Sequence, residues 1–348
     1  MVELETFLGI DYPTLWYLVV GLLFSGYAIL EGFDYGAGAW HLFLKKDLSR
    51  RIAINAIGPL WDANQVWLII GGGALFAGFP VMYATMLSAM YIPFMLFLVL
   101  LVLRSAAIKF RSAEEMIWWR KTWDIIYFVS NTLIAFLLGV VLGNVLQGFE
   151  IGENFSYKGG IFFAFLSPYA IMVGFTTLSI FMTQGAIFLL LKTEGRLYER
   201  LTFLLKKGMI FFIVSFAITS LYTLVFLPGV TDKFKEYPVF FILPILAFLA
   251  VANVPRLVSK KKYGNALVFS SLTMAFLLML VAFQLYPVLL PSTIDPKFSV
   301  TIYNAASSQK SLGIMLTIVV IGAPLLAGYF LFLYKTFHGK VKLDDTSY

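Results

Sequence analysis

The sequence contains no cysteine and only two histidines, His41 and His338, in 348 residues. Without cysteine the chain can form no disulfide, no thiolate metal site and no thioether-linked haem. Two histidines are too few to act as axial ligands to several haems. His41 has no second ligand one helical turn away, so we interpret it as a solvated or hydrogen-bonded residue. No metal site is predicted.

Charged residues are also scarce. They make up 13% of the chain, whereas hydrophobic residues make up 60%. An ordinary soluble domain has about 25% charged and 45 to 50% apolar residues. The composition therefore predicts a polytopic membrane protein. The net charge of +7 is assigned to loops that determine membrane topology, and no nucleic-acid partner is expected.

Nine stretches are long enough to cross the lipid bilayer, since a spanning helix needs about 20 mostly apolar residues. They cover residues 14–44, 54–77, 79–103, 123–147, 160–191, 207–227, 238–256, 265–290 and 310–336. The prediction is an all-α polytopic membrane protein with nine transmembrane helices.

The distribution of basic residues predicts the orientation of these helices. Of the 26 Lys and Arg residues, 21 fall on one set of alternate loops and five on the other. Loops rich in Lys and Arg remain in the cytoplasm. We therefore expect the amino terminus outside and the carboxyl terminus in the cytoplasm.

The chain also has a weak internal duplication. The first span contains Glu31-Gly32-Phe33-Asp34-Tyr35-Gly36, and the fifth ends similarly in Thr183-Gln184-Gly185-Ala186. This predicts two four-helix bundles plus one additional helix. The expected parts are residues 1–150, which carry the polar motifs, residues 151–290, and residues 291–348 with the ninth helix and a tail.

The second span holds the most unusual polar residues. Residues 58–73 place Asp62, Asn64 and Gln65 between two tryptophans in an apolar segment. An ionisable side chain at membrane depth costs about 2.5 to 3.5 kcal/mol or more, so Asp62 should face protein, a partner subunit or water. Asp62 and Gln65 share a helix face, and Pro59 favours a local break.

Glu31 and Asp34 form a second acidic pair on one face of the first helix. Burial raises the proton affinity of carboxylates, so both are candidates for proton transfer, although structural hydrogen bonding remains the alternative. Gly32 and Gly36 predict a close helix contact.

Other polar residues receive structural interpretations. Arg104 ends the third predicted span and is read as a basic anchor reaching the membrane surface, or as the counter-charge of an anionic group. Asp124 is expected to have a structural role near the start of the fourth helix. Close packing is expected to explain Gly139 and Gly143, and also Gly71, Gly72 and Gly73.

Three segments together resemble subunit II of the cytochrome bd-type quinol oxidases. They are residues 31–36, residues 58–68 and the stretch Gly143-Asn144-Val145-Leu146-Gln147-Gly148. The family pattern Trp-Asp-Gly-Asn matches Trp61, Asp62 and Asn64, with Ala63 in place of the glycine.

The resemblance implies a subunit of a membrane complex that oxidises quinol and reduces O2 to water. Haem b and haem d-type groups would belong to subunit I, and a structural quinone and a small accessory membrane subunit are conceivable additions. The location would be a bacterial or archaeal cytoplasmic membrane.

Within this family the site residues would take separate roles. Asp62, with Asp34 and Glu31, would transfer protons taken from the cytoplasm. Trp61, Asn64, Gln65 and Arg104 would lie near the haem region of the partner. The alternative function is a secondary transporter with proton-coupled carboxylates, which also suits broken helices and repeats.

Overall fold

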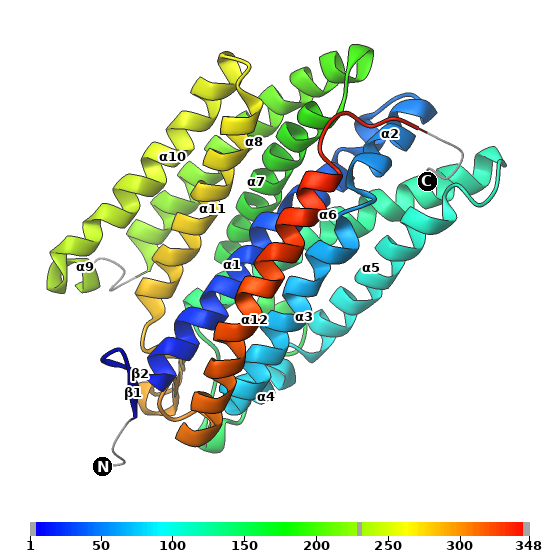
Figure 1. Ribbon diagram of the computed structural model, residues 1–348. Coiled ribbons are helices and arrows are strands. Elements are labelled where there is room, and N and C mark those ends of the chain that lie inside the picture. The colour runs from blue at the N-terminus through cyan, green and yellow to red at the C-terminus, as the bar shows by residue number, and fades with distance from the viewer. Residues whose placement is uncertain (1–4, 228–231, 344–348) are drawn as a thin grey trace.

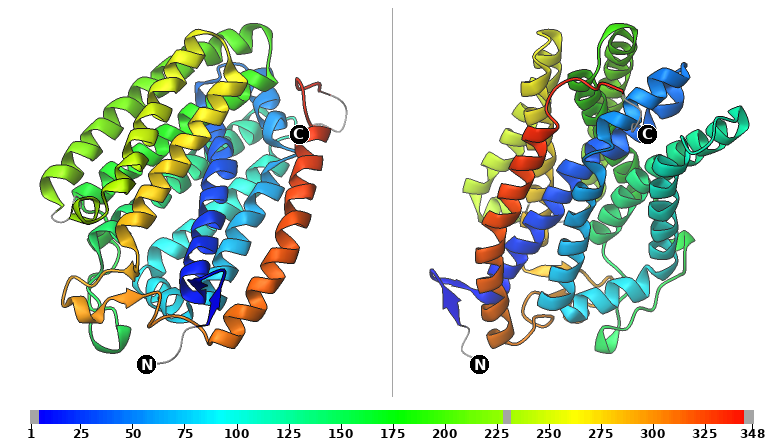
Figure 2. Two further views of the ribbon diagram at one scale, coloured as in Figure 1. Left: turned by 60° about the vertical axis from the view of Figure 1, so that its left-hand side comes forward. Right: turned by 45° about the vertical axis from the view of Figure 1, so that its right-hand side comes forward.

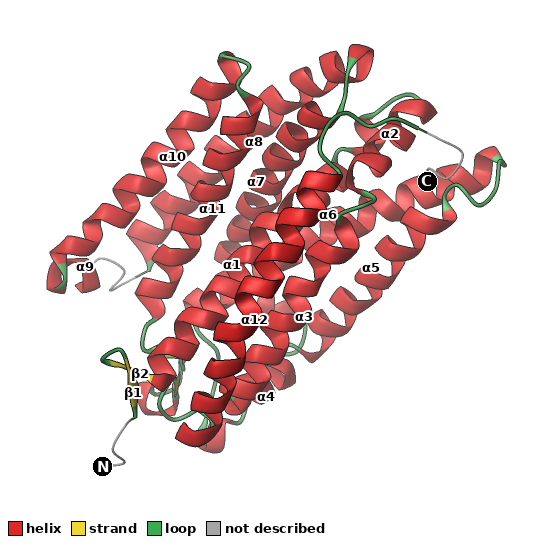
Figure 3. Cartoon of the chain, in the orientation of Figure 1, coloured by secondary structure: helices red, strands yellow, loops and turns green. Residues whose placement is uncertain are grey.

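The computed structural model describes residues 5–227 and 232–343. Within them the chain is almost entirely helical (Figure 3). The α-helices are α1 (Tyr12–Ala39), α2 (Asp47–Ile57), α3 (Trp61–Gly78), α4 (Pro80–Ala89), α5 (Tyr91–Phe110), α6 (Ile117–Gln147), α7 (Pro168–Lys192), α8 (Gly195–Phe226), α9 (Asp232–Glu236), α10 (Ile242–Ser259), α11 (Tyr263–Leu285) and α12 (Gln309–Thr336). Strands β1 (Thr6–Phe7) and β2 (Ile10–Asp11) pair antiparallel, as do β3 (Val288–Leu290) and β4 (Val300–Thr301).

Eight helical segments of the described chain are long and apolar enough to cross a membrane, and a bent pair can form a ninth span. The pair consists of α3 and α4, which meet at an angle of 116°. Figure 2 shows α4 running across the end of the bundle. The predicted number of nine is thus reached when the bent pair counts as one span.

The predicted limits of the second and third spans are wrong. The helix predicted over 54–77 is interrupted at 58–60, so α2 and α3 are separate. The helix predicted over 79–103 is divided into α4 and α5, and α5 continues to Phe110. Pro80 and Pro93 lie in the first turns of α4 and α5, where the missing N–H removes no helical hydrogen bond. Hydropathy alone does not mark these breaks.

Later boundaries also differ from the prediction, and the sixth span, predicted from residue 207, begins at Gly195. The span predicted from residue 160 begins at Pro168, because Ser167 caps α7 by accepting a hydrogen bond from the Ala170 amide. The span predicted to reach residue 290 ends at Leu285, and β3 follows it. Proline disfavours helical backbone in the residue before it, and Pro287 lies just after this end.

The two ends of the bundle differ in composition. The strands lie at the end near the label N in Figure 1, whereas the junctions that carry most basic residues lie at the other, together with residues 337–343. We call the end with most of the basic residues the basic end. Lys340 binds the carbonyls of Leu190 and Thr193 there, at 3.2 and 2.8 Å. The outermost residues of the predicted first and last parts, 1–4 and 344–348, lie outside the described residues.

Helix α1 is central and contacts α3, α6, α7, α11 and α12 (Figure 1). Its closest approach is to α7, where an added Cβ at Gly36 would lie 1.7 Å from the carbonyl oxygen of Phe181. A Cβ at Gly185 would lie 2.3 Å from the Ala37 nitrogen. The predicted close contact of Gly32 and Gly36 is confirmed, and it brings α1 and α7 almost backbone to backbone.

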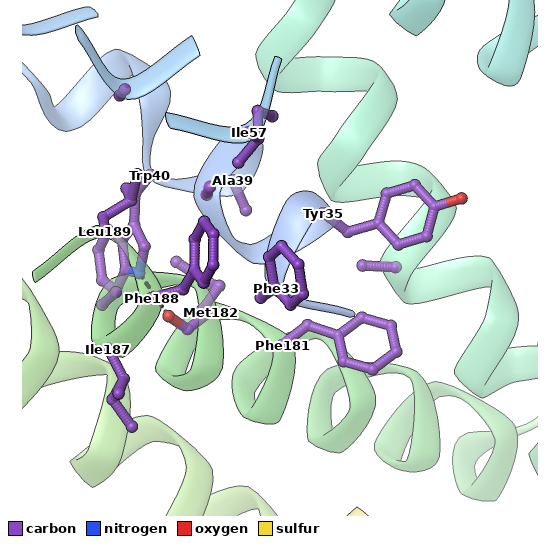
Figure 4. Packing of buried hydrophobic residues seen from close by; sticks show 14 of the residues in the cluster. Phe33, Tyr35, Ala39, Trp40, Ile57, Phe181, Met182, Ile187, Phe188 and Leu189 are labelled. Carbon is purple, nitrogen blue, oxygen red and sulfur yellow. Dashed lines mark hydrogen bonds between the residues drawn. The ribbon is translucent and has the colours of Figure 1, made fainter. Parts of the chain in front are cut away.

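Aromatic side chains surround this crossing (Figure 4). The ring of Phe33 stacks on Phe188 with centroids 4.1 Å apart. Trp40 donates a hydrogen bond from Nε1 to the carbonyl of Met182 at 2.7 Å. Residues from both predicted four-helix parts therefore share one hydrophobic cluster.

The other glycine predictions separate into two groups. A Cβ at Gly139 or Gly143 would come within 2.7 Å of α7, which confirms close packing of α6 on α7. Gly71 is only in ordinary contact with Phe24, and an added Cβ at Gly72 or Gly73 would meet nothing within 4 Å. Within the described chain Gly72 and Gly73 therefore make no close helix contact, and the packing predicted for them stays a prediction.

Candidate proton-handling site

Two acids and one arginine meet inside the bundle, where all three side chains are fully buried. Arg104 of α5 forms an ion pair with Glu31 of α1 at 2.9 Å and approaches Asp34 at 4.0 Å. The interpretation of Arg104 as an anchor reaching the membrane surface is wrong, because its guanidinium ends 0% exposed between helices. Its other predicted role, counter-charge to an anionic group, is the one that the contacts support.

The remaining partners of Asp34 come from α3 and α12. Asn64 donates from Nδ2 to Asp34 Oδ2 at 2.8 Å and to the carbonyl of Leu30 at 3.2 Å. Tyr334 of α12 donates its hydroxyl to Asn64 Oδ1 at 3.0 Å. The acid thus has a hydrogen-bonded connection to the ninth predicted helix.

Aromatic rings enclose the guanidinium of Arg104. Its carbon lies 4.5 Å from the ring centroid of Tyr35 and 5.8 Å from that of Trp61. Cation–π contacts of this kind stabilise a cation that is away from water. Trp61 is itself 5% exposed, so the structure places this predicted residue directly against the buried site.

Several polar atoms of this site have no hydrogen-bond partner within the described part of the chain. Outside the ion pair between Arg104 Nη1 and Glu31 Oε2, they include Oε1 of Glu31, Oδ1 of Asp34, Nε and Nη2 of Arg104 and the hydroxyl of Tyr127. Buried polar groups are nearly always satisfied by protein or by ordered water. The buried acid pair is therefore incompletely hydrogen-bonded within the described chain.

Asp62 is not part of this cluster. It follows Trp61 in the first turn of α3, but its side chain is exposed on the outside of the chain, whereas Trp61 and Asn64 point inward. Asp62 is near enough to repel Glu31 electrostatically. The predicted proton carriers therefore divide into a buried pair and one acid on the outer face of α3.

Gln65 lines a groove of about 860 Å³ between α3, α4 and α5. The walls are mainly apolar, with Leu68, Leu101 and Phe97 among them, and Gly72 and Gly73 line the α3 side. Lys109 and Ser105 add polar groups. Gln65 thus lies at the edge of an outward-facing groove and not in the buried acid cluster.

A second ionic cluster lies at the basic end. Asp124 of α6 receives Arg111 Nε at 2.6 Å, Arg50 at 2.9 Å and His41 Nε2 at 2.5 Å. Arg111 also contacts Asp47 at 2.6 Å. Burial lowers the pKa of His41 below its ordinary value, although the hydrogen bond to Asp124 opposes this shift. The structural role predicted for Asp124 and the hydrogen-bonded state predicted for His41 agree with these contacts.

Sequence reasoning missed Tyr334 and the enclosing residue Tyr35. Tyr334 lies in an aromatic-rich helix end, which is common at membrane interfaces and carries no specific signal. Tyr35 belongs to the Glu31–Gly36 motif, but its contact with the arginine could not be predicted because aromatic residues are ordinary in membrane helices. The acidic side chains of the motif, Glu31 and Asp34, carry the stronger signal for a functional site.

Fold and site together define a polytopic membrane protein with a buried acid–arginine cluster. A family model for cytochrome bd terminal oxidase subunit II matches residues 12–337. The chain therefore belongs to this family, as the motifs predicted. Members of the family are subunits of an oxidoreductase complex, the terminal quinol oxidase.

Individual relatives cover nearly the whole chain. The sequence is 32% identical to cytochrome bd-I ubiquinol oxidase subunit 2 of Escherichia coli (strain K12), over 97% of each chain. It is also 32% identical to cytochrome bd ubiquinol oxidase subunit 2 of Bacillus subtilis (strain 168), over 94% of this chain and 96% of that one. These bacterial relatives and the apolar helices indicate a bacterial membrane protein.

A solved structure has the same fold. A chain of the bd oxidase from Geobacillus thermodenitrificans superposes with a TM-score of 0.77 at 20% identity, over 94% of this chain and 98% of that chain. This likeness concerns the fold alone.

Proposed function

We propose that this chain is the subunit II that supports a haem-bearing subunit I in a complex that oxidises quinol and reduces O2 to water. The match to the family over residues 12–337 carries the proposal. A reduced-minus-oxidised optical spectrum of the chain, purified gently from its native membrane, tests it. Co-purifying haem is expected, and its absence would count against the oxidase and favour the transporter alternative.

The residues of this chain do not suit haem ligation. His41 directs Nε2 at Asp124, and its ring packs edge-on against Tyr127 with centroids 4.9 Å apart. His338 is exposed just beyond α12. We therefore assign haems of b and d type to subunit I, and extraction of haem from the separated subunits tests that assignment.

The outer face of α3 is proposed to meet subunit I. Asp62 lies on this face with two exposed apolar residues, Ile69 and Phe76, which are 70% and 59% exposed. A carboxylate on such a face would be costly against lipid. The neighbouring groove offers Gly72 and Gly73, and small residues let membrane helices approach closely. A helix of subunit I in this groove would cover both features.

Gly72→Leu would place a larger side chain in the groove, and its Cβ would meet no atom of this chain within 4 Å. The expected result is loss of co-purified subunit I. Gly322→Leu on α12 is the matched control, because Gly322 also has open space around it. Retention of subunit I with Gly72→Leu, or equal loss with both variants, would exclude the groove as the docking site.

We also propose that Asp62, covered by subunit I, relays protons taken from the cytoplasm. Glu31 and Asp34 would hold protons further inside, and Asn64 and Gln65 would order water along the approach. The buried unpartnered oxygens of the acid pair support hydration of this region. The basic end of the bundle would then face the cytoplasm, as the distribution of Lys and Arg predicts.

Asp62→Asn tests the relay, because the amide keeps the shape but cannot carry a proton. We expect O2 reduction to fall about 100-fold or more, the usual contribution of a positioned proton-transfer group, with haem content and assembly preserved. Asp232→Asn, an exposed acid on α9, is the control. Unchanged oxygen reduction in a normally assembled Asp62→Asn complex would exclude Asp62 as a relay.

The location and remaining components are proposed from the same family assignment. The complex would lie in the cytoplasmic membrane with the amino terminus outside, and protease accessibility of tagged termini tests this orientation. Mass spectrometry of the intact complex tests for an accessory subunit. Solvent extraction of the same preparation tests for a structural quinone.

A further inference from the structure

A line of hydrogen bonds runs from α12 through α3 to α1. Tyr334 donates to Asn64 Oδ1 at 3.0 Å, and Asn64 Nδ2 donates to Asp34 Oδ2 at 2.8 Å. The same Nδ2 also donates to the carbonyl of Leu30 at 3.2 Å. Both amide hydrogens and the amide oxygen of Asn64 are therefore used, and Asn64 is 0% exposed.

The orientation of the Asn64 amide matters because its two ends are chemically opposite. One end donates and the other accepts. In the observed orientation Asp34 receives a donor, which favours its charged form. If the amide turned over, its oxygen would face Asp34 Oδ2, and that contact would be favourable only if Asp34 carried a proton.

Tyr334 influences the orientation and the donor strength of the Asn64 amide. Its hydroxyl supplies the hydrogen that Asn64 Oδ1 accepts, which holds the oxygen away from Asp34. Donation to an amide oxygen also strengthens the amide as a donor at its nitrogen, because linked hydrogen bonds polarise one another. The carbonyl of Leu30 also accepts a hydrogen bond from Asn64 Nδ2, but a carbonyl cannot donate to the oxygen of Asn64.

The other groups that act on Asp34 come from α1, α5 and α6. Glu31 repels it, Arg104 attracts it at 4.0 Å, and the phenol of Tyr127 interacts with it electrostatically. Asp34 Oδ1 has no hydrogen-bond partner among the described residues. Asn64 of α3 therefore hydrogen-bonds Asp34 from a neighbouring helix. A change in this contact would change the proton affinity of Asp34.

We propose that Tyr334 is a positioning residue that, through Asn64, sets the pH range in which Asp34 binds and releases a proton. The inference rests on the proposed proton-handling function of the acid pair. It adds α12 to that function, since the ninth predicted helix would control the proton occupancy of an acid on the first.

Infrared titration of the purified complex tests this directly. The protonated carboxyl band of Asp34 is identified by its absence in Asp34→Asn. In Tyr334→Phe we expect the midpoint of that band to move to higher pH by up to about one unit, because loss of the tyrosine hydroxyl weakens the hydrogen bond that Asn64 donates to the charged Asp34. Tyr329→Phe is the matched control, because Tyr329 lies on α12 but is 50% exposed.

A second comparison separates coupling from general damage. In an Asn64→Ala background, Tyr334→Phe should cause no further shift, because the connection to Asp34 is already broken. An unmoved midpoint in Tyr334→Phe, or an equal shift with and without Asn64, overturns the proposal. The titration does not depend on turnover, so it can succeed even if Asp62→Asn shows that the relay proposal is wrong.

Discussion

The two ionic clusters of this protein contain similar groups but differ in how many of their polar atoms have hydrogen-bond partners. At the basic end, Asp124 receives hydrogen bonds from Arg111, Arg50 and His41. Inside the bundle, Arg104 faces Glu31 and Asp34 with most of its polar atoms unpartnered in the described chain. We call them the basic-end cluster and the buried cluster.

This difference indicates different roles. A carboxylate that accepts hydrogen bonds from three side chains fixes helices in place, although Nδ1 of His41 has no partner in the described chain. An incompletely satisfied cluster, with two acids to one arginine, has an excess negative charge that a proton can neutralise. The basic-end cluster is thus suited to hold α1, α2, α5 and α6 together, and the buried cluster to exchange protons.

The largest effect is expected for Arg104→Gln. It leaves two fully buried acids without their cation, and breaking a buried ion pair from one side typically costs about 3 to 5 kcal/mol. The melting temperature of the complex should fall strongly. Arg104→Gln combined with Glu31→Gln should recover part of the loss, because one uncompensated charge is removed. A melting temperature unchanged by Arg104→Gln would show that water already solvates the acids.

A smaller effect is expected for Arg111→Gln in the basic-end cluster. Arg111 is also buried, at 2% exposed, but Asp124 keeps Arg50 and His41 after the substitution. The expected loss is about 1.5 to 3 kcal/mol, the range of hydrogen bonds to charged groups. Thermal unfolding of the two single arginine variants in the same detergent gives the comparison. A larger loss for Arg111→Gln than for Arg104→Gln would reverse the ranking of the two clusters.

The sequence allowed the composition of the buried cluster to be predicted better than its geometry. Charged residues in apolar spans are costly, so both acids of the cluster, Glu31 and Asp34, could be identified from their positions alone. The pairing of Arg104 with Glu31 depends on how α1 and α5 rotate toward each other, which the hydropathy of single helices does not determine. The hydropathy of single helices does not determine the direction of Asp62 either. Its side chain points outward because α3 begins only at Trp61, after the break at 58–60.

Fold prediction shows a similar division. Long apolar stretches located both ends of α12 and the last residue of α6 to within one residue, because lipid imposes that length. The predicted boundary at residue 78 coincides with the break between α3 and α4, but the break between α4 and α5 at Met90 was missed because the sequence stays apolar across it. Tyr334 was missed because its role depends on one hydroxyl reaching Asn64 from a helix about 270 residues away in sequence.

The smallest expected effect concerns pH and His41. Burial lowers the pKa of His41 in the folded protein, so the unfolded chain binds more protons as the pH falls through the ordinary imidazole range. Stability should therefore decline on acidification from neutral pH. His41→Gln should flatten this decline in melting temperature, whereas His338→Gln, which changes an exposed histidine, should leave it intact. An unchanged slope in His41→Gln would mean that the hydrogen bond to Asp124 fully compensates burial, and the basic-end cluster would then tolerate an imidazolium as readily as it tolerates its two arginines.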